Sequence, residues 1–280
     1  MARGLTVTLL LLVNLVRWGT PIMLVGIVKF AVHMTAPRSR MRTRVILLLA
    51  RMAERWVAGN DRIFDRLLPT RWDIAGIGDD VRPDGHYLII SNHVSWVDIF
   101  VLFRAFHRRA PFIRFFLKHQ LIWVPIVGQG CWALEFPFMH RYSPEYVKAH
   151  PEKKGKDLET TRRACQRYRN FPVAIANFVE GTRFTLRKRD EQQSPYRHLL
   201  RPRVGGISFV FASLGEHLDA TYDVTIAYPR PEATVWEFVS GKIATITVRA
   251  RRVEMPPPEE SKAWVEALWR EKDELLDGLM

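Results

Sequence analysis

The sequence predicts an α/β fold, with one main domain built on a largely parallel or mixed sheet flanked by helices. An N-terminal helical segment associated with a membrane is expected to precede it. Three observations lead to this prediction. Short apolar runs alternate with helical patterns from about residue 70 onward, which is the order typical of α/β proteins. Two of those runs end in polar turns, and a long apolar stretch lies near the N-terminus.

Residues 1–35 contain the candidate membrane segment. Residues 5–16 are mostly apolar and residues 22–28 resume the run, so that about 24 residues could cross a hydrocarbon core of roughly 30 Å as a helix. Arg17 near the middle is costly in lipid, and Gly19-Thr20-Pro21 is expected to break a helix. Two possibilities therefore stay open: one imperfect span, or a helical hairpin that dips in from one side.

Residues 36–70 are predicted to form a basic amphipathic helix. Arginines at alternate positions from 38 to 44 follow the apolar segment, which places the C-terminal side of that segment in the cytoplasm. Within residues 45–68, apolar side chains recur mostly at spacings of three and four. This face could lie in acyl chains or pack against the domain. A cleaved signal peptide is not expected, since no small-x-small site follows the apolar stretch.

Residues 71–280 alternate between strand-like and helix-like patterns. The candidate strands are Trp72–Ile77, Tyr87–Ile90, Ala133–Phe138, Val173–Val179, Asp223–Ala227 and Ile243–Val248. The candidate helices are Val97–Phe106, Pro111–Leu117, Asp157–Asn170, Val204–Leu214 and Ser261–Leu279. Pro111 suits the first position of its helix, where a missing N–H has no cost. Residues 141–156 and 186–200 are predicted to be charged loops, and three prolines at 256–258 separate the C-terminal helix from the body.

Composition restricts the class of protein. With 280 residues, 48% of them hydrophobic, the chain can bury one sizeable core, so one main domain with an appendage is expected. Lysine and arginine outnumber acidic residues by 42 to 29, a balance that suits nucleic acid or an anionic lipid surface. Cys131 and Cys165 make neither a disulfide framework nor a zinc motif, which favours a reducing compartment.

The first polar turn follows the apolar run 87–90. Residues 91–98 read Ser-Asn-His-Val-Ser-Trp-Val-Asp. On one continuous helix, residues five apart point roughly 140° away from each other. His93 and Asp98 can therefore meet only if His93 lies in the turn and Asp98 in the first turn of the next helix. Such a pair can deprotonate an alcohol. The alternative is a helix cap followed by an ordinary first-turn acid.

The second polar turn follows the apolar run that begins at residue 173. It reads Glu180-Gly181-Thr182-Arg183, and it ends a predicted buried strand, where open α/β sheets bind ligands. Arg183 offers a planar donor fork for phosphate or carboxylate, and Gly181 lets the backbone approach a ligand. Glu180 can orient the arginine or accept a hydrogen bond from a substrate hydroxyl. The alternative is a turn held by a salt bridge.

These turns belong to a longer series of blocks. In chain order the blocks are Asn92-His93-x4-Asp98, residues 118–125 with Gly128, Phe138-Met139-His140-Arg141, residues 178–183, residues 202–206 and residues 224–229. Together they resemble the signature of the PlsC-like glycerophospholipid acyltransferases, the 1-acylglycerol-3-phosphate O-acyltransferases. Residues 132–139 and 154–163 are similar to the bacterial YihG-type subgroup. The resemblance covers the chain from about residue 20 to the C-terminus.

The resemblance implies that residues 71–280 form an acyltransferase domain. His93 would be the general base oriented by Asp98, and Lys118 or backbone N–H groups near His93 would stabilise the oxyanion. The residues implied to bind the substrate are Glu180, Gly181, Thr182, Arg183 and Arg141. The chain departs from the family at Met139-His140, where Ile-Asp is frequent, and at Arg203, which replaces a lysine. His140 could alter the headgroup that is recognised.

The implied reaction transfers a fatty acyl group to the free hydroxyl of a lysophospholipid, for which 1-acylglycerol-3-phosphate is the expected acceptor. Lysophosphatidylglycerol or lysocardiolipin could take its place. The expected co-substrate is acyl-CoA or acyl-acyl carrier protein, and neither a bound cofactor nor a metal is expected. The expected location is the inner membrane, with the catalytic domain on the cytoplasmic face against anionic lipid.

Two functions of a different kind also fit the sequence. A membrane-tethered thioesterase would use the same histidine to activate water, and a lipid-binding scaffold without enzymatic activity would need neither His93 nor Asp98. A nucleic-acid partner is not expected, because the basic tract flanks an apolar segment.

Overall fold

The computed structural model describes residues 1–280 except 37–38, 141–143 and 154. The longer helices are α1 (Ala2–Thr35), α2 (Arg40–Leu67), α3 (Val97–Phe106), α4 (Val127–Ala133), α6 (Lys156–Tyr168), α8 (Gly205–Leu214) and α10 (Ser261–Leu279). The shorter helices are α5 (Pro144–Ala149), α7 (Leu186–Glu191), α9 (Val235–Val239), η1 (His119–Trp123), η2 (Pro151–Lys153), η3 (Gly215–His217) and η4 (Pro258–Glu260). The strands are β1 (Arg71–Ala75), β2 (His86–Ser91), β3 (Ile113–Phe115), β4 (Leu117–Lys118), β5 (Phe138–Met139), β6 (Val173–Phe178), β7 (Ala220–Ala227) and β8 (Thr245–Val253).

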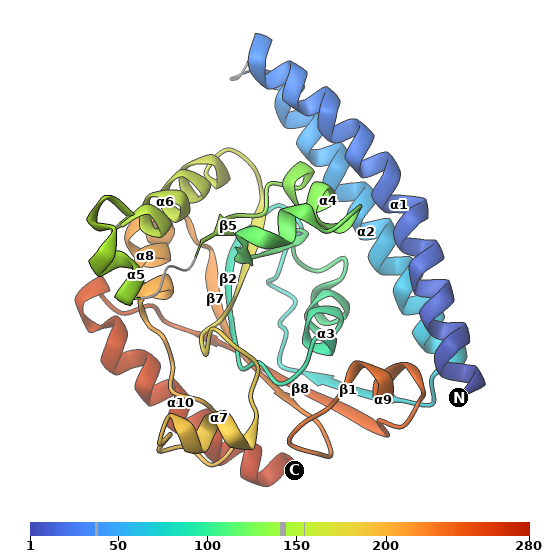
Figure 1. Cartoon of the computed structure of the whole chain (residues 1–280), viewed down its shortest axis with the longest axis vertical. Coiled ribbons are helices and arrows are strands. Elements are labelled where there is room, and N and C mark those ends of the chain that lie inside the picture. Colours follow the sequence, from blue (N-terminus) through green and yellow to red (C-terminus); the bar gives the residue numbers. More distant parts are fainter. Residues whose placement is uncertain (37–38, 141–143, 154) are drawn as a thin grey trace.

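A mixed six-stranded sheet forms the centre of the domain, with the strand order β1-β8-β7-β2-β6-β3 (Figure 1). Neighbouring strands run parallel except for the antiparallel pair β7 and β8. The three central strands β7, β2 and β6 are almost entirely buried, which explains why they read as near-continuous apolar runs. The predicted α/β class with a largely parallel or mixed sheet is confirmed.

Two hydrophobic cores cover the two faces of this sheet. Alternate residues of β2 point to opposite faces, so that Tyr87 and Ile89 join one core while Leu88 and Ile90 join the other. The first core contains most of the buried side chains of α2 and α3, and the second contains those of α6, α8 and α10. In open α/β sheets, ligands bind at the carboxyl ends of the strands, between the helical layers that cover the two faces.

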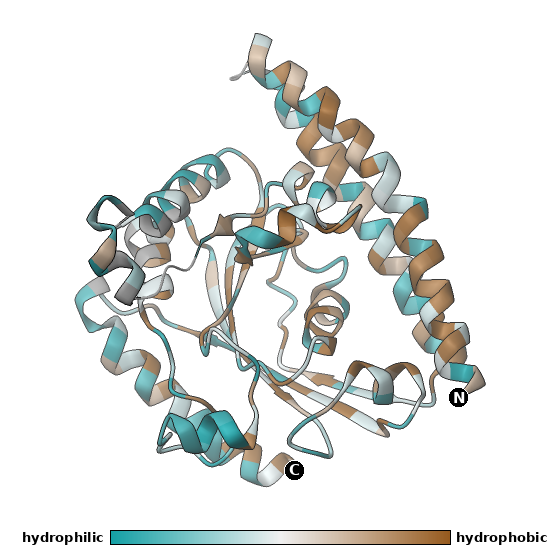
Figure 2. Ribbon diagram, in the orientation of Figure 1, coloured by the Kyte–Doolittle hydropathy of each residue, from teal (hydrophilic) through white to brown (hydrophobic). Residues whose placement is uncertain are grey.

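The N-terminal apolar segment is one continuous helix, α1, and it is long and apolar enough to cross a membrane. The helical hairpin considered for residues 1–35 is therefore wrong, because α1 continues through Pro21. Tertiary contacts hold it: Asn14 donates to Trp56 O and Asn60 Oδ1 of α2, both at 2.9 Å, and α1 also packs on α4. Figure 2 shows apolar residues along much of α1. Many of them are exposed, which suggests membrane association.

Helix α2 packs its apolar face against the domain rather than leaving it free. Val45, Leu49, Ala53 and Val57 along this face belong to the first core. The helix begins at an N-cap serine, Ser39, whose side chain accepts a hydrogen bond from the backbone N–H three residues later. In Figure 1, α1 and α2 lie side by side along one flank of the sheet domain.

Two predicted elements have the wrong type. Residues 111–117 contain strand β3 instead of a helix, because Ile113 and Phe115 fit a buried position where β3 pairs with β6. Residues 133–138 contain the end of α4, a turn and only the first residue of the short strand β5, instead of one continuous strand. Glu135 has a φ of 65° in that turn, and its carboxylate contacts three cations from α1, α2 and α6. In both segments long-range contacts override the local pattern.

Part of the second predicted charged loop, residues 186–200, is also helical. It contains α7, whose N-cap Thr185 accepts a hydrogen bond from Lys188 N at 3.2 Å. The first predicted loop, residues 141–156, includes the short helices α5 and η2 and extends partly outside the described residues. Both cysteines are free thiols, and Cys165 is buried in the second core.

Candidate active site

The side chains of His93 and Asp98 meet at the carboxyl end of β2. His93 lies in the turn after the strand, and Asp98 lies in the first turn of α3. His93 Nδ1 is 2.8 Å from Asp98 Oδ2. The Asp98 side chain is fully buried, whereas 12% of the His93 side chain is exposed. Because Nδ1 faces the carboxylate, Nε2 is the nitrogen that remains for a substrate.

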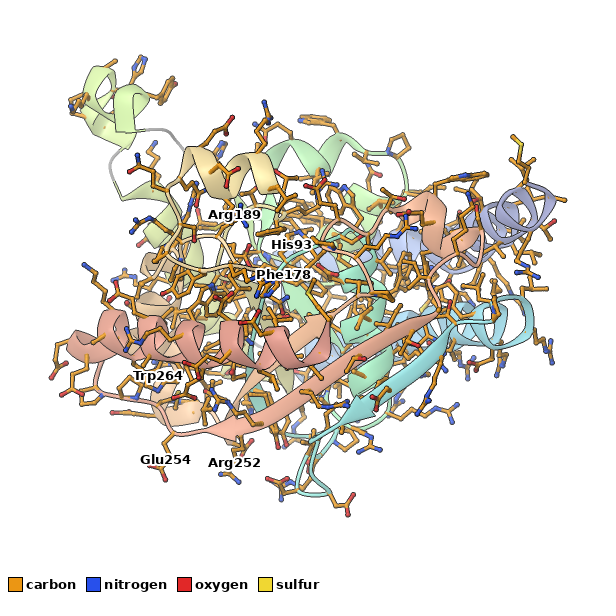
Figure 3. The ribbon with its side chains drawn as sticks, turned by 90° about the horizontal axis from the view of Figure 1, so that it is seen from below. His93, Phe178, Arg189, Arg252, Glu254 and Trp264 are labelled. Atoms are coloured by element: carbon orange, nitrogen blue, oxygen red, sulfur yellow. The ribbon has the colours of Figure 1, made fainter. Side chains whose placement is uncertain are left out.

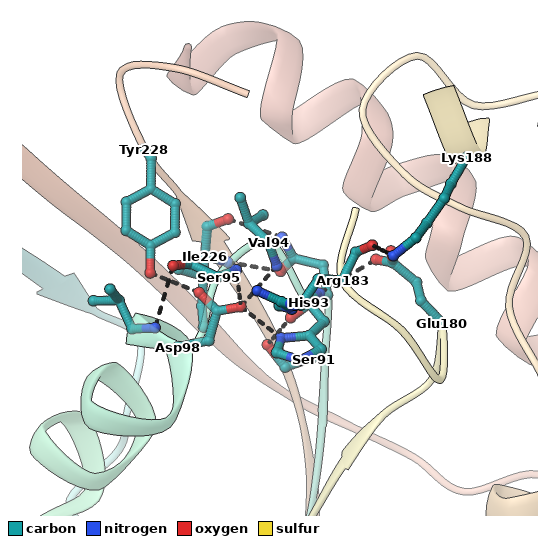
Figure 4. A network of polar contacts seen from close by, with 12 residues as sticks. Ser91, His93, Val94, Ser95, Asp98, Glu180, Arg183, Lys188, Ile226 and Tyr228 are labelled. Atoms are coloured by element: carbon teal, nitrogen blue, oxygen red, sulfur yellow. Dashed lines mark hydrogen bonds and ion pairs between the residues drawn. The ribbon is translucent and has the colours of Figure 1, made fainter. Parts of the chain in front are cut away.

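Backbone donors hold the Asp98 carboxylate in place. Val94 N and Ser95 N donate to Oδ2 at 2.7 and 2.9 Å, so this oxygen binds the turn that precedes α3 while it accepts from the imidazole. The hydroxyl of Tyr228, directly after β7, donates to Oδ1 at 2.6 Å. Figure 4 shows these contacts converging on Asp98 from the turn and from the end of β7.

The turn that carries His93 is fixed on several sides. Asn92 bridges to β7: its amide donates to Ile226 O and its carbonyl oxygen accepts from Ile226 N, both at 2.8 Å. Phe184 N donates to His93 O at 2.7 Å. The ring of Phe178 stacks on the imidazole with the centroids 4.1 Å apart, and Figure 3 shows the two residues together in the interior. The imidazole is therefore preorganised rather than mobile.

A cavity of about 260 Å³ opens in front of His93. Residues from both predicted motifs line it, together with Lys118 and apolar side chains of α3, β3 and η1. Gly181, Thr182 and Arg183 are in the wall, and the Arg183 guanidinium lies 5.1 Å from the centre of the Trp96 ring. The structure thus places the imidazole, two cations and a threonine around one cavity.

Glu180 has a different position from the one expected. It follows β6 at the same strand end, but its side chain is buried behind the His93 turn and does not line the cavity. Its Oε1 accepts a hydrogen bond from His93 N at 3.3 Å, and burial raises the pKa of this carboxyl well above its usual value. Glu180 therefore helps to hold the His93 turn. Its position gives no support for contact with a substrate.

The backbone conformation at position 181 explains why this residue is a glycine. Its φ of 69° lies in the left-handed region that favours glycine, and its N–H donates to Phe178 O at 2.9 Å to close the turn. A Cβ at this position would lie 3.1 Å from Cδ of Arg203. The remaining predicted substrate ligand, Arg141, lies outside the described residues.

Three contributors to the site were not predicted from the sequence. Phe178 and Tyr228 stand in the motif blocks, but no role was inferred for their rings. Lys188 lies on α7, and its Nζ donates to Thr182 Oγ1 and to Arg183 O, both at 2.9 Å. In open α/β sheets, ligands bind at the carboxyl ends of the strands. Tyr228 directly follows β7, so this rule could have indicated it as a residue of the site. No local pattern distinguishes Lys188 in a highly charged segment.

Among the described residues, no three His, Cys, Asp or Glu side chains gather as a metal ion would require. The donors around the cavity are nitrogen cations, an imidazole and a hydroxyl, which suit an anionic substrate.

Comparison with known proteins gives the family. The Acyltransferase family model matches residues 74–228, which contain both polar turns and Tyr228. The chain belongs to the Acyltransferase family. The YihG-type subgroup inside this family stays a prediction, because these comparisons do not test it.

Named relatives are similar at low identity. A 1-acyl-sn-glycerol-3-phosphate acyltransferase 2 from Brassica napus is 28% identical over 210 residues, covering 69% of this chain and 51% of the relative. A 1-acyl-sn-glycerol-3-phosphate acyltransferase epsilon from Mus musculus is 26% identical over 227 residues, covering 71% and 59%. The chain spans about half the length of the curated relatives it matches.

A solved structure supports the fold. The crystal structure of the 1-acyl-sn-glycerophosphate (LPA) acyltransferase PlsC from Thermotoga maritima matches with a TM-score of 0.51 at 15% identity. The match covers 92% of this chain and 97% of the other chain, so it extends beyond the residues that the family model covers.

Proposed function

We propose that this acyltransferase is membrane-bound and transfers a fatty acyl group from an acyl thioester to the free hydroxyl of a lysophospholipid. The acceptor we favour is 1-acylglycerol-3-phosphate. One observation carries the proposal: the His93–Asp98 pair, 2.8 Å apart, faces the same cavity as Lys118 and Arg183. Family membership and the names of the relatives support it.

His93 supplies the base that a weakly nucleophilic hydroxyl requires. Its Nε2 takes the proton of the acceptor hydroxyl while the oxygen attacks the thioester carbonyl carbon. Asp98 keeps the proton of the imidazole on Nδ1 and stabilises the imidazolium that forms. When the tetrahedral intermediate collapses, the carbon–sulfur bond breaks and the thiol leaves with the proton that His93 returns. The C–O bond of the new ester remains.

Lys118 is the donor that we assign to the oxyanion. Backbone N–H groups near His93 are the competing donors, but the N–H groups of His93, Val94 and Ser95 already donate to carboxylates. Lys118 lies in β4 and lines the cavity together with His93. An ammonium group placed there can stabilise the negative charge that develops on the carbonyl oxygen.

Arg183 and its neighbours form the phosphate site in this proposal. The guanidinium offers paired donors to a phosphate, and Thr182 adds a hydroxyl to the same wall. Lys188 adds a second positive charge beside Arg183, where burial and repulsion from Arg183 lower the pKa of its ammonium group. Within the part of the chain that the structure describes, no carboxylate forms an ion pair with these cations, which favours a dianionic headgroup as their partner.

The apolar surface of α1 supports membrane binding in the same proposal. Many of its large side chains are at least half exposed, among them Leu5, Leu9, Leu12, Val13, Val16, Leu24, Ile27, Val28 and Phe30. Trp123 at the end of η1, near the cavity residue Leu121, is 77% exposed, and tryptophan is favoured at membrane interfaces. Arginines at the start of α2 follow α1, which favours the cytoplasmic face of the inner membrane for the domain.

The test is an acyl-transfer assay on the full chain in vesicles that contain anionic lipid. Acyl-CoA and acyl-acyl carrier protein are supplied in turn as donors, and lysophosphatidic acid, lysophosphatidylglycerol and lysocardiolipin as acceptors, with products identified by mass spectrometry. We expect diacyl product with a phosphate-bearing acceptor. Free fatty acid formed at a comparable rate without acceptor would instead make the protein a thioesterase. Flotation of the vesicles with bound protein checks the membrane part separately, and a chain that binds lipid but converts no acceptor would be a scaffold.

A further inference from the structure

The two oxygens of the Asp98 carboxylate have different partners. Oδ2 accepts from His93 Nδ1, Val94 N and Ser95 N at 2.7 to 2.9 Å. Oδ1 accepts from the hydroxyl of Tyr228 at 2.6 Å. We propose that Tyr228 is a positioning residue of the catalytic base, which fixes the orientation of the Asp98 carboxylate and weakens its pull on the imidazole proton. This inference rests on the proposed acyl transfer.

The hydroxyl is held rigidly where Asp98 needs it. Tyr228 is 3% exposed and directly follows β7, whose Ile226 is bonded on both sides to the amide of Asn92. Pro229 restricts the backbone of the preceding tyrosine to extended conformations. The strand end, the His93 turn and the start of α3 therefore form one connected unit, and the tyrosine ring cannot turn away without breaking its packing.

The direction of this hydrogen bond is fixed. Burial and the neighbouring charge of Asp98 raise the pKa of Tyr228 well above its usual value, so the phenol keeps its proton and donates it. A buried carboxylate oxygen without a donor is costly. Without the phenol, the carboxylate loses the contact that fixes Oδ1 and can tilt while Oδ2 keeps its contact with Nδ1, and this tilt moves the imidazole out of alignment with the acceptor hydroxyl.

The same hydrogen bond tunes the base. The donated proton lowers the electron density on the carboxylate, so the imidazolium is stabilised less than it would be by an unpartnered Asp98. Removing the hydroxyl therefore favours the imidazolium and raises the pH at which His93 becomes a free base. Among the residues that the structure describes, the other charged groups near the imidazole are Glu180 from the end of β6, Lys118 and Arg183 in the cavity wall, and Lys188 of α7 beside Arg183. None of these is altered by a change at Tyr228.

The experiment replaces Tyr228 by phenylalanine, which keeps the ring and removes the hydroxyl. We expect kcat to fall about 10- to 100-fold with the KM for either substrate nearly unchanged, which is the size expected for losing a hydrogen bond to a buried charge. The acid limb of the pH–rate profile should move to higher pH. The matched control is Tyr222→Phe, since Tyr222 is a buried tyrosine of β7 whose hydroxyl contacts Asp80 at 3.3 Å, away from the cavity. It should leave the rate and its pH dependence unchanged.

A double-mutant cycle separates positioning from general destabilisation. In an Asp98→Ala background, Tyr228→Phe should change the residual rate by less than about 3-fold, because the partner of the phenol is gone. Equal losses in both backgrounds, or an unchanged pH profile in Tyr228→Phe, would overturn the inference. A wild-type protein that transfers no acyl group would instead refute the proposed function. The pH dependence of diethylpyrocarbonate modification of His93, taken against His93→Ala, still tests the tyrosine in that case.

Discussion

Helix α3 carries a histidine–carboxylate pair at each end, and the two pairs share their geometry but differ in their surroundings. At its start, His93 Nδ1 lies 2.8 Å from Asp98 Oδ2. At its end, His107 Nδ1 lies 2.9 Å from Asp61 Oδ2 of α2. The two imidazoles are similarly exposed, at 12% and 14%. A short histidine–aspartate contact by itself therefore does not identify a catalytic base.

The two pairs differ in the hydrogen-bond partners of their carboxylates. Asp98 is fully buried, and its donors come from its own turn and from Tyr228. Asp61 is 16% exposed, and its second oxygen accepts from Arg104 at 3.3 Å. Arg104 in turn contacts a second aspartate of α2, so the cation beside this pair is already neutralised. Within the described residues, the cations that face His93 have no carboxylate partner. The first pair therefore fits the anionic substrate that we propose, whereas the second pair joins α3 to α2.

Removing each carboxylate should produce the largest difference in kcat between the two pairs. Asp98→Ala should lower kcat about 10²- to 10⁴-fold, because the imidazole loses both its tautomer and its orientation. Asp61→Ala should leave kcat within about 3-fold and lower thermal stability instead. Steady-state rates and thermal unfolding of both variants check this. Comparable losses of kcat in the two variants would show that the pairs do not differ in function.

The next largest effect is expected on the KM for the acceptor, when the arginine near each pair is removed. Arg183→Ala should raise the KM for a phosphate-bearing acceptor about 10- to 100-fold and change the KM for the acyl donor far less. Arg104→Ala should change neither KM. Initial rates measured over a range of each substrate separate these outcomes. An equal rise of both KM values in Arg183→Ala would show that Arg183 does not bind the acceptor phosphate specifically.

The smallest effect is expected at Glu180. Because Gln keeps an oxygen that can accept from His93 N, Glu180→Gln should retain activity within about 3-fold. A carboxyl whose pKa is raised by burial makes the folded state lose stability as pH rises from the unfolded value, about 4.3, through the folded value. Glu180→Gln should remove that part of the pH dependence, which thermal unfolding between about pH 4 and 8 measures. A large rise in the KM for the acceptor would instead place Glu180 against the substrate.

The comparison also shows what a sequence can predict. The His93–Asp98 pair was predicted because five residues across a strand-to-helix turn leave one geometry in which both side chains meet. The buried strands β2, β6 and β7 were predicted because strands covered on both faces are apolar along their length. Tyr228 was missed as a partner of Asp98, since 130 residues separate them and only the β2–β7 pairing brings them together.

The wrong elements have the same cause. Residues 111–117 read as a helix with an N-terminal proline, but pairing with β6 makes Ile113–Phe115 an edge strand. Residues 133–138 read as a strand, but all except Phe138 lie in the end of α4 and a turn, where Glu135 has a positive φ and pairs with three cations from distant helices. The role predicted for Glu180 depended on its place in a motif, whereas the direction of its side chain is set by burial behind the turn. Local patterns do not contain these contacts.

The most direct measurement compares His93→Ala with His107→Ala in the same vesicles, with the same acyl donor and lysophospholipid acceptor. Each variant removes one of the two similar pairs at the ends of α3. We expect His93→Ala to lose at least about 10³-fold in the rate of acyl transfer while it still floats with the vesicles, and His107→Ala to stay within about 3-fold of the wild type. Acyl transfer at the wild-type rate by His93→Ala would contradict this expectation.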